Sequence, residues 1–505
     1  MIFFPKQALY STSLFVISLV CAFVGTSCSS GVKEENPQVL SIPKPAIQAS
    51  EKLVLSEKPE DKALCESLDK IIADRDAPNE KWGMMFVSLS DGRVLCARDA
   101  RGLYLPASVQ KLVTSAAALE KLGPGYRFRT SVFAKREIEN GILDSDLVLY
   151  GRGAPDFDKT SLTGLVRDLK KKGLKTVKGD IVGDSSYFKA DALGDGWTWN
   201  EAQWYYGAAA TALSYERNLV TISIRNGKPT ADSGYIELTG ELQPVGDIEA
   251  IGIKRKLGTN RVYVWGNGKD LEARIAISDP ALFTARVFRE TLAAQGIDVQ
   301  GEVRSADWTK PTGAAEGTEL TSAESSQLGE LVGTMNRDSV NLYAEVILRT
   351  LGKKFGAEAP DPNPRLNKLR GDDLAGASVV KELLAENGID SSTLAIHDGS
   401  GLSRLARMTP ESIARTLIFS AQSNHSKVFT DSLPVAATSG TLRGRLKGVA
   451  GLVSAKTGSI KYANSLAGFA RRDDETIAFV IICNDETTRT DSTATIDAIV
   501  LKIAR

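Results

Sequence analysis

The sequence predicts an α+β protein in which one antiparallel sheet with packed helices is split by a large β-rich insertion. Two strand-like runs, Trp82–Leu89 and Arg93–Arg98, flank the turn-forming pair Asp91-Gly92. The C-terminal end repeats this pattern with Ser465–Arg471 and Thr476–Cys483. Because both ends have the same character and the middle is dominated by short strands, we expect the two ends to share one sheet.

Length and composition narrow the class of protein. The chain has 505 residues, which is enough for roughly two to four packed units. Its 62 basic and 62 acidic residues balance, which argues against a nucleic-acid-binding protein. Only two histidines occur, His397 and His425, so a histidine-rich metal site and a Ser-His-Asp triad are both disfavoured. We expect no cofactor and no metal.

The N-terminus has the pattern of an export signal over residues 1–27. Lys6 precedes an apolar stretch, Leu14–Val24, which is shorter than a membrane span requires. Cys28 follows directly, so either lipidation of Cys28 or plain secretory cleavage fits the sequence. The segment 28–60 is rich in Pro, Lys, Glu and Ser, which predicts a flexible tether. We therefore expect an exported protein of the periplasm or cell envelope, with lipidated Cys28 as its membrane attachment.

Three cysteines lie in the body of the chain, Cys65, Cys96 and Cys483. Three cannot all pair internally, and their spacing matches no metal motif. We interpret them mainly as small buried hydrophobic residues.

The remaining elements follow in chain order. Helical patterns are expected at Asp61–Asp74, Leu112–Leu122, Leu162–Lys172, Ala281–Gln295, Val340–Leu351 and Thr493–Lys502. Short strands are expected at Asp146–Leu149, Gly179–Val182, Asn218–Ile224, Tyr235–Leu238, Arg261–Trp265 and Ala273–Ile277. These patterns place the first part of the main domain at 61–131, an insertion of two subdomains at 132–325, and the second part at 326–505.

The helix that ends at Gly123-Pro124 begins with a chemically informative pair, Ser108 and Lys111. Residues three apart lie on the same helix face, so the lysine amine can reach the serine hydroxyl. A buried lysine with a lowered pKa can remove the serine proton and make the hydroxyl a nucleophile. The spacing alone is weak evidence, because Ser-x-x-Lys occurs six times in the chain.

Two further motifs strengthen this interpretation. Ser339-Val340-Asn341 is the only Ser-x-Asn in the chain and begins an amphipathic helical pattern. Lys456-Thr457-Gly458 is the only Lys-Thr-Gly, and it comes just before the C-terminal hairpin. Ser-x-x-Lys, a Ser-x-Asn motif and Lys-Thr-Gly in this order form the signature of penicillin-binding proteins and serine β-lactamases.

With these motifs the chain resembles the D-alanyl-D-alanine carboxypeptidases/endopeptidases of the class C low-molecular-mass penicillin-binding proteins, peptidase family S13. The offset of 228 positions from Lys111 to Ser339 is similar to that of this family, whose β-rich domains are inserted between the first two motifs. Further similar segments are GRGAPD (151–156), GDIVGDSSYF (179–188), GWTWN (196–200), DGSGLSR (398–404) and SGTL (439–442). One departure is Val340, where related enzymes often carry Asp. The resemblance implies the transpeptidase fold shared with serine β-lactamases.

The resemblance also implies roles in cleaving D-Ala-D-Ala of peptidoglycan peptides, with β-lactams as inhibitors. Ser108 would be the nucleophile, Lys111 its base and Ser339 the proton relay to the leaving amine. Asn341 would hold the substrate amide or Lys111. The other implied substrate contacts are Lys456, Thr457, Gly458 and Ser459, with the Ser108 and Ser459 amides as oxyanion hole.

Two more residues match family positions associated with the pocket for the peptide side chain, typically diaminopimelate. Asp184 and Arg404 would pair there with an ammonium and a carboxylate; turn capping and surface pairing are their alternative roles. His397 is expected to be a packed loop residue. Two other functions stay open: a non-catalytic peptidoglycan-binding or scaffold protein of the same fold, and a serine β-lactamase or esterase. The sequence leaves the oligomeric state undetermined.

Overall fold

The computed structural model describes residues 40–75, 77–242, 250–267, 270–360, 369–487 and 491–504. The predicted signal segment and Cys28 lie outside these ranges. Within them, no helix combines the length and apolar character that crossing a bilayer requires.

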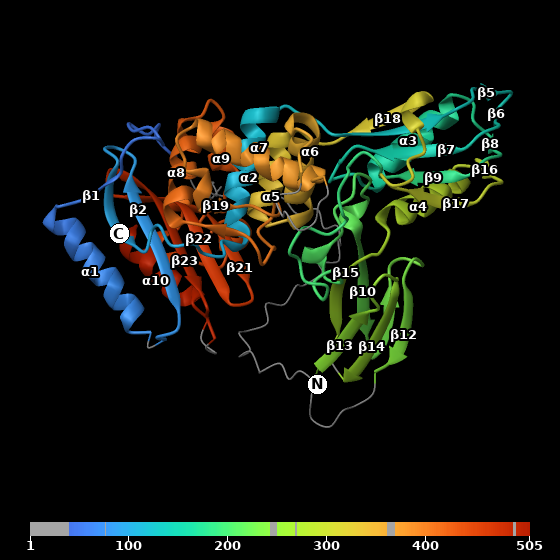
Figure 1. Ribbon diagram of the computed structural model, residues 1–505. Coiled ribbons are helices and arrows are strands. Elements are labelled where there is room, and N and C mark those ends of the chain that lie inside the picture. Colours follow the sequence, from blue (N-terminus) through green and yellow to red (C-terminus); the bar gives the residue numbers. More distant parts are fainter. Residues whose placement is uncertain are drawn as a thin grey trace, which may run out of the picture. The chain divides into compact units, whose positions relative to one another are not determined.

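The main sheet has six strands in the order β1-β3-β2-β23-β22-β21 and unites both ends of the chain (Figure 1). Its strands are β1 (Val54–Leu55), β2 (Lys81–Ser88), β3 (Arg93–Arg98), β21 (Val453–Ile460), β22 (Ala463–Arg472) and β23 (Glu475–Asn484). β2 pairs antiparallel with β23 over its whole length, from Lys81 opposite Asn484 to Ser88 opposite Ile477. The predicted α+β architecture is therefore confirmed, and the shared sheet is antiparallel except where the short β1 pairs in parallel with β3.

Helices cover both faces of this sheet. Alternation along β2 sends Met84 and Phe86 into one core and Met85 and Val87 into another. The first core is shared with α1 and α10, and the second with α2 and α8 (Figure 1). These helices are α1 (Pro59–Ala73), α2 (Gln110–Leu122), α8 (Pro410–Gln422) and α10 (Thr493–Ile503). A sheet buried on both faces explains why its strands read as continuous apolar runs.

A helical layer beside the sheet contains α2, whose residues from Gln110 to Leu119 are all buried. The turn η1 (Ala107–Val109) leads directly into it, and Gly123 ends it with φ 78°. α2 packs against the other helices of this layer. They are α5 (Leu328–Arg337), α6 (Asn341–Phe355), α7 (Asp372–Glu386) and α9 (Ser426–Asp431).

The insertion leaves and returns through two paired strands, β4 (Arg129–Ala134) and β18 (Thr318–Glu324). They belong to a five-stranded sheet in the order β17-β9-β7-β4-β18, beside a four-stranded sheet in the order β16-β8-β6-β5. Helices α3 (Lys159–Lys171) and α4 (Pro280–Ala294) pack on these strands. The strands are β5 (Ile138–Glu139), β6 (Ile142–Leu143), β7 (Leu147–Gly151), β8 (Thr176–Val177), β9 (Ile181–Asp184), β16 (Asp298–Val299) and β17 (Val303–Ala306).

A second part of the insertion consists of two three-stranded sheets, ordered β11-β10-β15 and β12-β14-β13. Their strands are β10 (Leu219–Arg225), β11 (Lys228–Ala231), β12 (Glu237–Glu241), β13 (Ala250–Arg255), β14 (Arg261–Asn267) and β15 (Leu271–Ala276). The short turns η2 (Tyr205–Gly207) and η3 (Glu216–Asn218) come just before β10. They bring this part of the insertion to the helical layer, because η2 contacts α6.

Two sequence interpretations are corrected by the structure. The expected tether over 28–60 does not extend over residues 40–60, which lie against the fold. Ile47 is buried, the Ala46 amide donates to the Leu89 carbonyl, and β1 pairs with β3. The composition is polar, but backbone pairing and a few apolar anchors hold the segment.

The cysteine interpretation is also wrong for two of the three residues. Cys65 of α1 and Cys96 of β3 form a disulfide with an S–S distance of 2.00 Å, and Cys483 is the buried free thiol. Thirty-one residues separate the pair, and the packing of α1 on β3 brings them together. Spacing alone contains no sign of this contact.

Candidate active site

The Ser108–Lys111 pair lies at the start of the helical layer, as its spacing predicts. Ser108 is in η1 and Lys111 is in the first turn of α2, so the lysine nitrogen Nζ lies 2.8 Å from Ser108 Oγ. Nζ also donates to Asn341 Oδ1 at 2.6 Å and to the Ser400 carbonyl at 2.8 Å. Three oxygen partners therefore fix the amine beside the hydroxyl.

Burial adjusts the basicity of this amine. Lys111 has no exposed surface, and desolvation lowers the pKa of its side chain to about 7, against the opposing pull of the acids Asp398 and Glu345. An amine with this pKa is partly neutral at neutral pH. It can therefore accept a proton from the serine hydroxyl.

Ser339 and Asn341 lie at the start of α6, and Asn341 binds the Lys111 amine. Ser339 has a left-handed backbone, φ 56°, which is costly for a residue with a side chain. The Asn341 amide bridges two parts of the chain, since Oδ1 accepts from Lys111 and Nδ2 donates to the Tyr206 carbonyl at 2.8 Å. The insertion thus contacts the site directly through Tyr206.

Lys456 of β21 completes the cluster. It is fully buried, and its Nζ donates to Ser339 Oγ at 2.9 Å and to the Thr457 carbonyl at 2.7 Å. Burial and the charge of Lys111 hold the pKa of Lys456 well below its usual value. The Thr457 hydroxyl lies 2.8 Å from Thr441 Oγ1 in the SGTL segment. All three sequence motifs therefore meet at one place.

Gly458 allows β21 to pass close to Ser108. A Cβ at this position would lie 3.0 Å from the Ser108 amide nitrogen and 2.9 Å from the Pro106 carbonyl oxygen. The absence of a side chain lets the strand lie beside η1, and it puts Ser459, the next residue, at the same edge. Ala107, just before the nucleophile, has φ 48°.

The loop DGSGLSR (398–404) lies beside Lys111, and the buried carboxylate of Asp398 organises it. It accepts from the Gly401, Leu402 and Ser403 amides at 2.9–3.0 Å. It also accepts from Trp197 Nε1 of GWTWN at 2.9 Å. The two segments singled out in the sequence are therefore one hydrogen-bonded unit, and Gln110 joins them to α2 through a 2.9 Å bond to Asp398.

Glu345 holds the other end of this loop. Its Oε1 accepts from the Gly399 and Ser400 amides at 3.0 and 2.9 Å, and the Ser400 carbonyl in turn accepts from Lys111. The side chain is fully buried, and desolvation raises the pKa of the carboxyl to about 8. Glu345 thus positions a direct hydrogen-bond partner of the Lys111 amine. Its position inside an apolar helical pattern offered no distinguishing sequence signal.

A second group of side chains fixes the segment before Ser108. Asn484, the last residue of β23, accepts from the Leu105 amide at 2.7 Å and donates to the Leu105 carbonyl at 3.1 Å. Ser465 of β22 donates to the Pro106 carbonyl at 2.7 Å. Two neighbouring backbone units are therefore anchored to the sheet just ahead of the left-handed Ala107. These contacts were not foreseen from the sequence.

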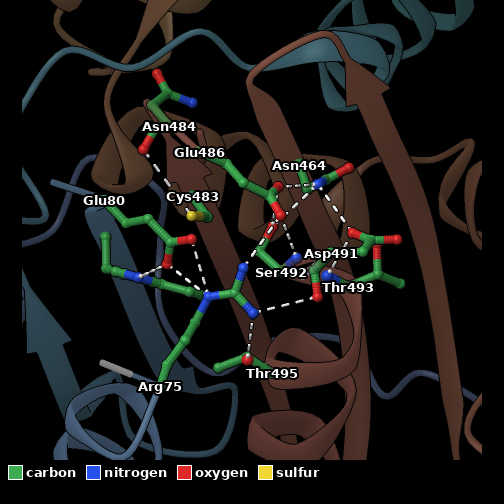
Figure 2. Close-up of polar contacts among 11 residues, drawn as sticks. Arg75, Glu80, Asn464, Cys483, Asn484, Glu486, Asp491, Ser492, Thr493 and Thr495 are labelled. Carbon is green, nitrogen blue, oxygen red and sulfur yellow. Dashed lines mark hydrogen bonds and ion pairs between the residues drawn. The ribbon is translucent and has the colours of Figure 1, made fainter. Parts of the chain in front are cut away.

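A buried polar network supports this end of the sheet (Figure 2). Figure 2 shows Arg75 between Glu80 and Glu486, with ion-pair distances of 2.7 and 3.1 Å. Glu486 also accepts from Asn464, which lies opposite Ser459 in the β21–β22 ladder. Charges that are paired and hydrogen-bonded in this way keep the strand ends in a fixed arrangement.

The structure does not bring together Asp184 and Arg404. Asp184 is fully buried at the end of β9 and accepts from the Ser186 and Thr312 amides, so its carboxylate serves the packing of the insertion. Arg404 instead pairs with Glu201 at 3.1 Å and donates to the Lys461 carbonyl at 2.8 Å, at the end of β21.

The two histidines stand apart from the lysine–serine cluster. His397 Nδ1 lies 2.8 Å from Asp195 Oδ2, and His425 is the residue before α9. His397 is therefore a loop residue with a carboxylate partner, in keeping with the packed role expected for it.

An α+β fold in which a serine hydroxyl lies beside a buried lysine amine, with a second Ser–Lys pair next to it, is typical of the penicillin-recognising serine enzymes. The sequence model of the D-Ala-D-Ala carboxypeptidase 3 (S13) family matches residues 64–505. The chain belongs to this family, and it is a serine peptidase.

Curated relatives agree with this assignment. The chain is 30% identical to the D-alanyl-D-alanine carboxypeptidase of Actinomadura sp. (strain R39) over 453 residues, covering 83% of this chain and 81% of the relative. It is 26% identical to the D-alanyl-D-alanine carboxypeptidase DacB of Haemophilus influenzae, covering 80% and 86%.

Among solved structures, penicillin binding protein 4 from Haemophilus influenzae has the same fold, with a TM-score of 0.74 and 24% sequence identity. The match covers 86% of this chain and 97% of that structure. The complex of that protein with a β-lactam gives a TM-score of 0.70 and 23% identity, over 86% of this chain and 98% of that structure.

Proposed function

We propose that this enzyme cleaves the D-Ala-D-Ala bond of peptidoglycan peptides through an acyl-enzyme on Ser108. The observation that carries the proposal is the 2.8 Å approach of the buried Lys111 amine to the Ser108 hydroxyl. Neutral Lys111 takes the hydroxyl proton as Oγ attacks the carbonyl carbon between the two D-alanines. The tetrahedral intermediate then expels the terminal D-alanine.

The leaving amine needs a proton, and Ser339 is the group proposed to deliver it. Its hydroxyl passes a proton to the amine nitrogen and is reprotonated from Lys456, its 2.9 Å partner. Lys111 then returns the proton it took from Ser108 to Lys456, which restores both lysines for the second half-reaction. Water attacks the ester carbon, the neutral Lys111 takes the water proton, and it passes this proton to Ser108 Oγ as the ester bond breaks. Asn341 holds Lys111 in place, and its amide is the contact proposed for the substrate backbone.

The oxyanion is assigned to two backbone amides, those of Ser108 and Ser459. Gly458 passes close to the Ser108 amide, so the amide of Ser459, the next residue, lies on the same side of β21 as the Ser108 amide. This supports the assignment of both amides to the oxyanion. The substrate carboxylate is assigned to the positive charge of Lys456 and the Thr457 hydroxyl. Burial lowers the pKa of Lys456, and a bound carboxylate would favour its charged form by offsetting the cost of that burial.

Arg404 is proposed to contact the side chain of the peptide substrate. Its pairing with Glu201 gives one cationic and one anionic group near the end of β21, which fits a zwitterionic side chain such as diaminopimelate. In this proposal Glu201, and not the buried Asp184, pairs with the ammonium group of that side chain. Peptides with diaminopimelate should then be cleaved faster than those with a neutral side chain. Arg404→Gln should remove that difference without changing penicillin acylation.

We also propose cleavage of D-Ala-diaminopimelate cross-links and inhibition by β-lactams. Both reactions use the same Ser108 attack on a carbonyl next to a D-configured residue or its cyclic mimic. A fold neighbour, penicillin binding protein 4 of Haemophilus influenzae, is described in complex with a β-lactam.

The proposed location is the cell envelope after export, with Cys28 as the lipid attachment point. The Cys65–Cys96 disulfide supports export, since disulfides persist mainly in oxidising compartments. Mass spectrometry of the mature N-terminus tests this location. A lipid-modified Cys28 is expected, and an unprocessed Met1 would contradict export.

The enzymatic proposal is tested by incubating the protein with N-acyl-D-Ala-D-Ala peptides and measuring released D-alanine, with Ser108→Ala as control. Release by the wild type alone supports the proposal. No release by either protein would favour the non-catalytic scaffold. Fast turnover of penicillin with no peptide cleavage would favour a β-lactamase.

A further inference from the structure

A cavity of about 430 Å³ opens on the side of the site where Ser339 and Asn341 lie. Its walls come from the insertion and from the main domain. The insertion contributes η2, η3 and β15, and the main domain contributes the end of α5, the start of α6 and the SGTL turn. If Ser339 delivers the proton to the leaving amine, this cavity lies on the leaving-group side of the scissile bond. The inference below therefore rests on the proposed function.

The charge of the cavity lining is strongly one-sided. Four arginine residues line it, and Asp338 is the acidic residue among its walls. Within the described residues, none of the four forms an ion pair with a carboxylate. The four arginines are Arg217, Arg274, Arg337 and Arg443. Uncompensated cations that converge on one concave site raise the local concentration of anions.

Arg217 is held in the cavity by a strained turn. Three consecutive residues, Glu216, Arg217 and Asn218, have φ of 48°, 58° and 60°. This left-handed backbone conformation is unfavourable for residues other than glycine. The fully buried Asn218 maintains it, accepting from the Tyr215 amide at 3.1 Å and donating to the Ala209 carbonyl at 2.8 Å. The Arg217 guanidinium lies 5.4 Å from the ring centre of Tyr343. The strained turn 216–218 thus places the Arg217 guanidinium at the cavity that Ser339 and Asn341 also line.

Arg274 reaches the same cavity from β15. Its guanidinium lies 4.9 Å from the ring centre of Tyr205, a cation–π contact that orients it without neutralising its charge. The neighbouring Tyr206 carbonyl binds Asn341, so the turn that orients Arg274 also holds a residue of the lysine–serine cluster. The insertion therefore contributes two cations at a fixed position relative to Ser339.

We infer that this cavity is a leaving-group subsite for substrates that carry a second carboxylate beyond the scissile bond. A single terminal D-alanine has one carboxylate, which Lys456 and Thr457 already serve in the proposed function. A leaving group that belongs to another peptide strand carries further carboxylates. The insertion thus acts as a selectivity element for anionic leaving groups.

The test compares two matched substrates, N-acyl peptides that end in D-Ala-D-Glu and in D-Ala-D-Gln. They differ only in the charge of the leaving side chain. The wild type should favour the D-Glu peptide by about tenfold in kcat/KM, the discrimination of one charge-assisted contact. The preference should shrink as salt is raised.

The double variant Arg217→Gln/Arg274→Gln should bring this preference to within about twofold, while its acylation by fluorescent penicillin stays at the wild-type rate. Arg225→Gln is the matched control, because Arg225 lies on neighbouring β10, pairs with Glu272 and does not line the cavity. If the double variant loses penicillin acylation, the single variant Arg274→Gln is tested in its place, because Arg274 is exposed. This variant should lose part of the preference for the D-Glu peptide.

Equal cleavage of both peptides by the wild type, or an unchanged preference in the variants, would overturn the inference while leaving the proposed function intact. Failure of the wild type to be labelled by penicillin or to cleave D-Ala-D-Ala would overturn the proposed function itself, and the subsite with it.

Discussion

The nitrogen of Lys111 lies 2.8 Å from the Ser108 hydroxyl and is completely shielded from solvent. This arrangement lets a lysine act where many hydrolases use histidine. A lysine in water is almost entirely protonated at neutral pH, but desolvation lowers the pKa of Lys111 to about 7. The scarcity of histidine in the chain is consistent with such a site.

The pH dependence of acylation should follow this pKa. Only neutral Lys111 can accept the serine proton, so the rate of penicillin acylation should rise about tenfold per pH unit below pH 7 and level off above it. Stopped-flow labelling at different pH values measures this. Lys111→Arg keeps the charge but cannot lose its proton, and it should be inactive throughout. A rate that is flat from pH 5 to 8 would exclude Lys111 as the base.

Replacing Asn484 should impair the site from a distance. Asn484→Ala removes both hydrogen bonds to the Leu105 backbone, and we expect acylation to slow by about tenfold while the protein remains folded. Asn387→Ala is the matched control, since Asn387 donates to the Leu383 carbonyl on α7. Equal acylation rates in both variants would show that the segment before Ser108 needs no such anchor.

The burial of Glu345 should make the stability of the folded protein depend on pH. Its carboxyl pKa is about 8 in the folded protein and about 4.5 when unfolded, so the folded state binds the extra proton and wild-type stability falls as pH rises between these values. Glu345→Gln lacks this proton. The melting temperature of the variant, measured relative to wild type, should therefore increase from pH 5 to pH 8 and level off above. A difference independent of pH would contradict the raised pKa.

The Cys65–Cys96 disulfide should contribute to stability. In the chain-entropy model, a bridge between residues 31 apart stabilises the fold by about 3.7 kcal/mol. Denaturant unfolding with and without a reductant measures this difference. The Cys65→Ala/Cys96→Ala variant should unfold at the lower denaturant concentration in both conditions. Identical unfolding of the oxidised and reduced wild type would indicate that the bridge contributes nothing.

Sequence patterns predicted most of the main domain. The hairpins around Asp91-Gly92 and Arg472–Asp474 were predictable because apolar strands flanked a polar turn, and their assembly into one sheet followed from their shared character. The Ser108–Lys111 and Ser339–Asn341 motifs lie at the starts of helices, as their patterns predicted, whereas Lys456-Thr457-Gly458 lies within β21. The supporting residues were harder to find. Asp398 and Trp197 lie in segments singled out by resemblance, but their mutual hydrogen bond depends on tertiary contact.

Other features had no local signal at all. Glu345 and Asn484 act through backbone groups distant in sequence, and a polar residue in an apolar helix or strand has several ordinary explanations. The segment 40–60 appeared to be a linker from its composition, but a few anchors such as Ile47 hold it on the fold. Arg217 depends on a left-handed turn that no periodicity predicts.

The most direct test of the Ser108 acyl-enzyme is intact-protein mass spectrometry after brief incubation with penicillin, for the wild type, Ser108→Ala and Lys456→Ala. The wild type should gain the mass of one penicilloyl group on a peptide containing Ser108. Ser108→Ala should gain none, and folded Lys456→Ala should gain it more slowly. An unmodified wild type, or equal modification of Ser108→Ala, would contradict the assignment of Ser108 as the nucleophile.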